Sequence, residues 1–200
     1  MANVRTTNSR LVSFNLMNQI NHGILISNLA YKMGQELGLE KQKCYDLAVA
    51  GMVHDIGKLR LAGYMEDNQL VVEELKYMRM HSQLSYEILK GRGYSDFVLE
   101  SVRYHHENYD GSGYPKHLQG EKIPFGARIL RVCDVFGALT EDRVYRKAFD
   151  KFTAIELMIE EVKNFDMLLF LVFQRIIHEE EDSYDIKEKA GDRDEGYSAS

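Results

Sequence analysis

The chain has 200 residues, enough for one domain with a single sizeable core, and its composition is ordinary for a globular protein, with 44% hydrophobic and 28% charged residues. Its formal net charge of −6 comes entirely from the C-terminal end, because residues 179–200 hold nine acidic and three basic side chains. The remainder is neutral, which argues against binding to duplex nucleic acid, since such binding needs a basic face. No apolar run approaches the roughly 20 residues that cross a bilayer, and the N-terminus lacks the apolar core of a signal peptide. We therefore expect a cytoplasmic protein with no membrane segment.

Apolar residues recur with a helical period over most of the chain, and no stretch alternates for long enough to predict a strand. The sequence therefore predicts an all-α fold, a bundle of about six to eight helices. Gly38 is expected to end the first helix, and Ser95 and Pro124 to begin two later ones. In chain order, the predicted helices span residues 10–38, 41–54, 69–90 (in two pieces that divide near His81), 96–105, 124–139, 152–163 and 165–178.

Two segments lack this helical period. Residues 107–123 contain three glycines and one proline, which predict a long structured loop. After His178 the sequence is acidic and loses its apolar period, so we expect one domain, 1–178, followed by a disordered tail, 179–200. Both an inert, solvated tail and a docking segment fit this composition.

Histidine and aspartate side chains recur at helical or helix-end positions. A histidine or aspartate in an apolar helix is costly unless its polar atoms find partners. Taken singly, His22 or His81 fits an ordinary core or surface histidine, whereas the His54–Asp55 pair, which follows a strongly apolar run, indicates a functional site. If such groups converge from separate helices, they form a site for two cations, and imidazole with carboxylate suits Fe, Mn, Zn or Co better than Ca or Mg. His117 and His178 are interpreted as ordinary surface residues.

Two motifs carry a resemblance to a known family. Residues 54–58 read HDIGK, and residues 105–115 read HHENYDGSGYP. Through them the chain resembles the HD-GYP family of bacterial phosphodiesterases, which hydrolyse cyclic di-GMP. The resemblance extends over about residues 15–177 and includes the segments 128–136 and 139–146.

The resemblance implies an HD-superfamily helical bundle with a structured GYP loop, and it implies a site. It implies two divalent transition-metal ions, Fe or Mn, with Asp55 as the bridging and catalytic carboxylate and Lys58 beside the scissile phosphate. It further implies that Tyr114, Arg143 and Arg146 contact the cyclic dinucleotide, although a solvated helix end is the alternative for the two arginines. The implied metal ligands are His22, His54, Asp55, His81, His105, His106 and Asp134.

The chain departs from the family pattern at two positions. Some members carry a glutamate where this chain has Asn18, which adds a ligand for a third metal, so two metals are expected here. The usual aspartate three residues after Asp134 is replaced by Gly137, a change that is expected to weaken substrate positioning or alter base preference.

Three functions follow from these motifs. The first is hydrolysis of cyclic di-GMP to linear pGpG, and further to GMP if a second bond is cut. The second is an HD-type phosphohydrolase that acts on another cyclic dinucleotide or nucleotide. The third is a signalling domain that binds a cyclic dinucleotide without turnover, which only Gly137 favours. Any controller is expected to be a separate regulatory protein.

Overall fold

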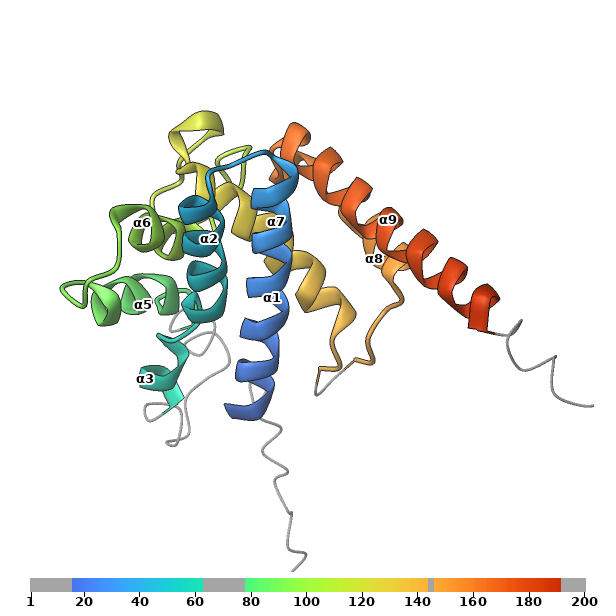
Figure 1. Ribbon diagram of the computed structural model, residues 1–200. Coiled ribbons are helices and arrows are strands. Elements are labelled where there is room, and N and C mark those ends of the chain that lie inside the picture. The colour runs from blue at the N-terminus through green and yellow to red at the C-terminus, as the bar shows by residue number, and fades with distance from the viewer. Residues whose placement is uncertain (1–15, 63–77, 144–145, 192–200) are drawn as a thin grey trace, which may run out of the picture.

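The computed structural model describes residues 16–62, 78–143 and 146–191, and these segments are helical and contain no strand. The all-α prediction is therefore confirmed. Two short 3-10 helices (Gly120–Lys122 and Val162–Asn164) and an isolated β-bridge between Arg143 and Arg146 complete the regular structure of these segments. The α-helices (Figure 1) are α1 (Leu16–Glu36), α2 (Lys41–Val53), α3 (Lys58–Ala62), α5 (His81–Leu89), α6 (Asp96–Tyr104), α7 (Phe125–Thr140), α8 (Lys151–Glu160) and α9 (Met167–Gly191).

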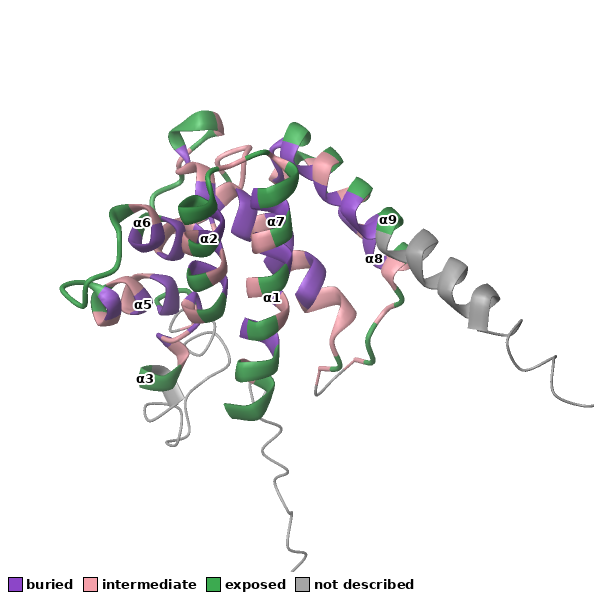
Figure 2. Cartoon of the chain, viewed as in Figure 1, coloured by how far each residue is buried: buried purple, intermediate pink, exposed green. Residues whose placement is uncertain are grey.

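The core is built around α7, which contacts α1, α2, α6, α8 and α9. Its buried apolar side chains, such as Ile129, Leu130 and Phe136, join those of α1, α2 and α9 in one cluster. Burying a side chain of this size contributes about 1.5–3 kcal/mol to the stability of the fold. Figure 2 shows that the buried positions follow the inward faces of α1, α5, α6 and α7. The helices that carry the candidate site are therefore held rigidly against one another.

Several helix ends lie where the sequence placed them. The φ angle of Gly38 is 66°, a left-handed conformation that glycine adopts without strain, and it closes the end of α1. The Ser95 side chain accepts a hydrogen bond from the backbone N–H of Val98 and so caps α6. Residues 69–77 of the predicted helix 69–90 lie outside the described residues, and α5 begins at His81, where the predicted helix was expected to divide. Between the predicted helices 41–54 and 69–90, the structure contains a short helix that was not predicted, α3.

The last helix is longer than expected. It was predicted to end at His178, but α9 continues to Gly191, so the backbone of 179–191 is helical rather than disordered. Buried residues such as Phe170 and Phe173 anchor its first turns. The Glu, Lys and Ala residues that follow propagate a helix readily once it has formed. The division at residue 178 between a domain and an acidic tail stays a prediction. Within the described segments, no helix combines the length and the hydropathy needed to cross a bilayer.

Candidate metal centre

The side chains predicted as metal ligands come from five helices or helix ends and meet at one place. His22 lies in α1, His54 and Asp55 follow α2, and His81 begins α5. His105 and His106 follow α6, and Asp134 lies in the middle of α7. All of them are at least half-buried, and His54 and His105 have almost no exposed surface. Residues separated by more than 100 positions in the sequence are thus brought together by helix packing.

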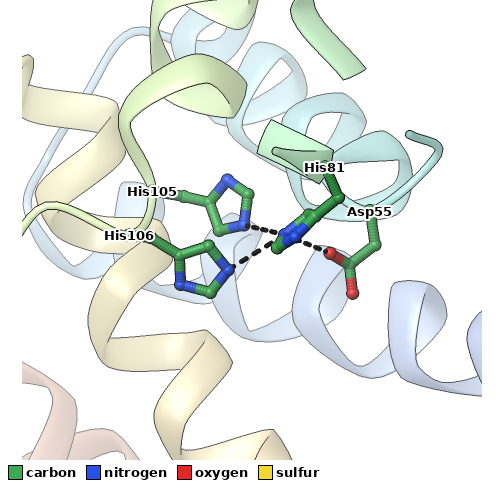
Figure 3. Close-up of side chains that lie close together, drawn as sticks. All are labelled: Asp55, His81, His105 and His106. Carbon is green, nitrogen blue, oxygen red and sulfur yellow. Dashed lines mark hydrogen bonds and ion pairs between the residues drawn. The ribbon is translucent and has the colours of Figure 1, made fainter. Parts of the chain in front are cut away.

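One group of donors consists of Asp55, His81, His105 and His106, whose ligand atoms all lie within 4.8 Å of one another (Figure 3). The Nε2 atom of His81 lies 3.0 Å from Asp55 Oδ1, 3.0 Å from His106 Nε2 and 3.4 Å from His105 Nε2. Three imidazole nitrogens and a carboxylate oxygen that converge in this way form a donor set for one transition-metal cation.

A second group consists of His22, His54 and Asp55, again with ligand atoms within 4.8 Å of one another. Asp134 extends this group, because its Oδ1 lies 3.1 Å from His22 Nε2 and 3.7 Å from His54 Nε2. Asp55 belongs to both groups: Oδ1 faces His81, and Oδ2 lies 3.4 Å from His54 Nε2. One carboxylate therefore directs one oxygen towards each group, which is the geometry that a bridging ligand needs.

Three of the histidines are oriented by the backbone. His54 Nδ1–H donates to the carbonyl of Gly51 at 2.7 Å, and His105 Nδ1–H donates to that of Val102 at 2.6 Å. His81 makes the same contact with the carbonyl of Met78. Each acceptor lies three residues earlier in the chain. A proton held on Nδ1 leaves the lone pair on Nε2, and in all three residues Nε2 points into the cluster.

The electrostatics of the cluster suit cations. His54 Nε2 and Asp55 Oδ1 are buried and have no hydrogen-bond partner within the described part of the chain. Burial, together with the charges on His54 and His81, lowers the pKa of His105 to about 3, so this imidazole is neutral, the form that binds metals. Burial alone would raise the pKa of Asp55, but the charges on His54 and Lys58 hold it well below its usual range.

His54 behaves differently in the metal-free chain. Burial opposes its protonation, yet the adjacent carboxylates of Asp55 and Asp134 outweigh burial and raise the pKa of His54 to about 10. A proton on Nε2 therefore stands where a cation would bind, and metal binding would release it. The unpartnered buried atoms, the ionised carboxylates and the neutral imidazoles together fit divalent transition-metal ions.

Gly57 determines how closely α5 approaches the HD motif. Its backbone N–H donates to the hydroxyl of Ser85 at 2.8 Å. A Cβ atom at this position would overlap the carbonyl oxygen of His81 and lie 2.7 Å from the backbone nitrogen of Ser85. The absence of a side chain therefore allows His81 to reach Asp55.

Gly57→Ala is expected to destabilise the protein by about 3 kcal/mol, because backbone atoms of α5 must move to make room for the new methyl group. Urea denaturation monitored by circular dichroism measures this change. The matched control is Gly38→Ala, where no atom lies within 4 Å and only the positive φ is strained, for about 1 kcal/mol. Equal losses in the two variants would show that the contact with α5 is unimportant.

The GYP loop folds back onto the end of α6, as the predicted structured loop requires. The buried Glu107 carboxylate accepts the backbone N–H groups of Lys116 at 2.6 Å and Leu118 at 3.0 Å. Tyr114 donates its backbone N–H to the His106 carbonyl, and its ring stacks on the His106 imidazole with centroids 4.8 Å apart. Tyr114 therefore lies beside the cluster. Sequence reasoning gave Glu107 no role, although its place in the HHE motif was the available signal.

The basic side chains that were predicted to act in catalysis or to bind the substrate differ in what they contact. The Lys58 ammonium forms an ion pair with Asp55 Oδ2, at the cluster. The Arg146 guanidinium donates to the carbonyls of Ala138 at 2.7 Å and Leu139 at 2.9 Å, so it caps the end of α7. This contact differs from the solvated helix end that was the alternative for Arg146, and the ligand contact stays a prediction. The backbone of Arg143 pairs with that of Arg146.

One residue at the site was not singled out from the sequence. Glu141 Oε2 lies 2.8 Å from Nδ1 of His22, on the side of the ring opposite Asp134. It is the first residue after α7, and the sequence carried no signal for its contact with a ring in α1.

Comparison with known proteins identifies the family. A model of the HD domain family matches residues 6–169. A cyclic di-GMP phosphodiesterase response regulator, RpfG of Xanthomonas campestris, is 37% identical over 129 residues, which cover 62% of this chain and 34% of that protein. The 3′3′-cGAMP-specific phosphodiesterase 1 of Vibrio cholerae is 35% identical over 143 residues, which cover 70% of this chain and 33% of that one. The chain thus spans about a third of the length of these curated relatives.

A solved structure has the same fold. The HDG"Y"P protein Bd1817 of Bdellovibrio bacteriovorus superimposes with a TM-score of 0.64 at 20% identity, over 80% of this chain and 52% of that one. The family match spans both the HD and the GYP motifs. As its HD-GYP motifs predicted, the chain belongs to the HD domain family.

Proposed function

We propose that this protein is a metal-dependent phosphodiesterase that opens cyclic di-GMP to linear pGpG at a binuclear centre. The observation that carries the proposal is the pair of donor groups that share Asp55, each oxygen of which faces one group. Relatives named as cyclic di-GMP phosphodiesterases support the substrate. Imidazole and carboxylate donors suit Fe, Mn, Zn or Co, and the resemblance to the HD-GYP family favours Fe or Mn among them. We place the reaction in the cytoplasm.

In this reaction water adds to phosphorus, the bond to the 3′ oxygen breaks, and that oxygen takes up a proton. A bound pair of divalent cations supplies Lewis-acid activation of the phosphate and of the attacking water. The residues that would hold these cations are His22, His54 and Asp134 in one donor group and His81, His105 and His106 in the other, and Asp55 belongs to both groups. Tyr114, stacked on His106, forms the wall against which the dinucleotide lies, and Arg143 and Arg146 pair with its second phosphate. The Arg146 side chain must leave the end of α7 to do so.

Lys58 is assigned to the leaving oxygen, because its ammonium already lies against Asp55 and only part of its side chain is exposed. Lys58→Ala is expected to lower kcat by about 10²-fold or more while both metal ions stay bound, since a positioned proton donor contributes on this scale. Steady-state kinetics with parallel metal analysis measure this effect. An unchanged kcat would remove Lys58 from the reaction.

The proposal is tested with protein purified anaerobically, loaded with Fe(II) or Mn(II) and incubated with cyclic di-GMP. Ion-pair chromatography separates pGpG and GMP from the substrate, and the double variant His54→Ala–Asp55→Ala serves as the inactive control. We expect pGpG from the loaded wild-type protein and none from the control. Binding of cyclic di-GMP without turnover by the metal-replete protein would support the signalling alternative instead.

A second candidate substrate is cyclic GMP–AMP, because one relative at 35% identity is named as a phosphodiesterase specific for it. Gly137 replaces the aspartate that is usual in the family, and this replacement is expected to alter the base preference of the site. Running both dinucleotides under the same conditions separates the candidates, since the preferred substrate gives the higher kcat/KM. A separate regulatory protein remains our proposal for control of the activity.

A further inference from the structure

His22 differs from the other oriented histidines of the cluster in what fixes its ring. His54, His81 and His105 lie at helix ends and donate Nδ1–H to backbone carbonyls. His22 lies inside α1, where the backbone carbonyls are already bonded within the helix. Its Nδ1 instead faces a side chain, the carboxylate of Glu141, at 2.8 Å. The orientation of this one ring therefore depends on a residue that a substitution can remove.

The imidazole of His22 lies between two carboxylates. Nδ1 faces Glu141 Oε2, and Nε2 lies 3.1 Å from Asp134 Oδ1, within the group that contains His54 and Asp55. The side chain of His22 is 6% exposed and that of Glu141 is 25% exposed, so solvent competes little for the contact. When Nδ1–H donates to Glu141, the lone pair of Nε2 points into the donor group. This is the carboxylate–histidine arrangement that orients metal-binding imidazoles.

Gly137 explains why the carboxylate reaches the ring from position 141. Asp134 and Gly137 lie on one face of α7, the helix that contacts α1, and Glu141 is the residue that follows the end of this helix, with an extended backbone. A Cβ atom at Gly137 would lie 3.3 Å from His22 Cε1 and 2.7 Å from Ile26 Cδ1. A carboxylate at 137, the residue usual in the family, would thus stand beside the same ring. With glycine there, the space beside His22 is open to a side chain that begins one turn later.

We infer that Glu141 is a positioning residue for His22: it fixes the tautomer with Nδ1 protonated and so sets the affinity of the cation held by His22, His54, Asp55 and Asp134. The inference rests on the proposed metal centre and adds to it the residue on which one of its two ions depends.

The test compares Glu141→Ala, Glu141→Gln and wild type by competition of Mn(II) with a chelator. Glu141→Ala is expected to weaken one of the two Mn(II) sites by about 10- to 100-fold and to leave the other unchanged. Glutamine keeps an oxygen that accepts Nδ1–H but lacks the charge, so Glu141→Gln is expected to restore most of the affinity. The matched control is Asp142→Ala, which removes the neighbouring carboxylate and its bonds to Lys147 and Ala148 but does not touch His22.

A second readout follows the ring itself. Nitrogen-15 NMR of the Zn(II)-loaded protein distinguishes the two tautomers of His22, and Glu141→Ala is expected to shift its Nδ1 resonance whereas Asp142→Ala is not. Adding Gly137→Asp to Glu141→Ala is expected to recover the lost affinity, because the Cδ1 end of Ile26 can move aside. Unchanged Mn(II) affinities and an unchanged His22 resonance in Glu141→Ala would overturn the inference.

The outcomes separate this inference from the proposed function. A protein that binds two ions, depends on Glu141 for one of them and leaves cyclic di-GMP intact would contradict the phosphodiesterase and keep the inference. An active phosphodiesterase whose metal affinities ignore Glu141 would contradict the inference alone. A wild-type protein that binds no divalent ion would contradict both.

Discussion

Asp55→Asn is expected to reduce the metal content from two ions per chain to one at most and to lower the rate of cyclic di-GMP hydrolysis by more than about 10³-fold. Asp55 is the one residue shared by both donor groups, with Oδ1 at 3.0 Å from His81 Nε2 and Oδ2 at 3.4 Å from His54 Nε2. An amide offers one oxygen and one N–H₂ group, and the N–H₂ group has no lone pair for a cation. One donor group therefore loses its carboxylate whichever way the amide turns.

Elemental analysis of the dialysed protein and chromatography of the products measure the two parts of this prediction. The matched control is Asp96→Asn, which removes an exposed carboxylate in the first turn of α6 and is expected to keep both ions and full activity. Two ions retained in Asp55→Asn would mean that the carboxylate does not bridge them. Circular dichroism verifies the fold, because the substitution also removes the partner of Lys58.

The residues alone indicated only part of the ligand set, because His22 and His81 taken singly fit ordinary histidines and the full set was implied by the family resemblance. The pair His54–Asp55 follows an apolar helix, and His105–His106 precedes a loop whose glycines have a steric purpose: a Cβ at Gly113 would overlap the backbone nitrogen of Asn108. Local chemistry of this kind needs no knowledge of helix packing. The helical class followed in the same way, from the period of the apolar residues.

The remaining features depend on distant parts of the chain, which a sequence pattern does not show. The contact between His22 and Glu141 joins residues 119 positions apart and exists only because α1 packs on α7. The guanidinium of Arg146 caps α7, although its place in the motif block indicated a ligand contact. The end of α9 was placed too early because the loss of the apolar period was taken as the end of the helix. A solvent-exposed helix needs no apolar face once its beginning is anchored in the core.

His22→Ala and His105→Ala are expected to remove different ions and to leave about one ion per chain in each case. Each is expected to lower kcat by more than the roughly 10- to 100-fold that is lost when a residue hydrogen-bonded to a metal ligand is removed. His22 belongs to one donor group and His105 to the other, so each substitution depletes one group only. Two Mn(II) ions bridged by a carboxylate couple magnetically, and electron paramagnetic resonance should therefore show isolated Mn(II) in both variants. His178→Ala is the matched control, since that exposed ring lies in a tilted contact with Phe152 and belongs to neither donor group.

The double variant His22→Ala–His105→Ala separates a binuclear reaction from two independent sites. If both ions act on one phosphate, either single substitution already disables the reaction, and the double variant is expected to be about as slow as the slower single one. If each ion acted alone, the two losses in log kcat would add. Since Asp55 directs one oxygen to each group, the non-additive result is the one we expect. Additive losses would mean that the two ions contribute independently, and would contradict a reaction in which both act on one phosphate.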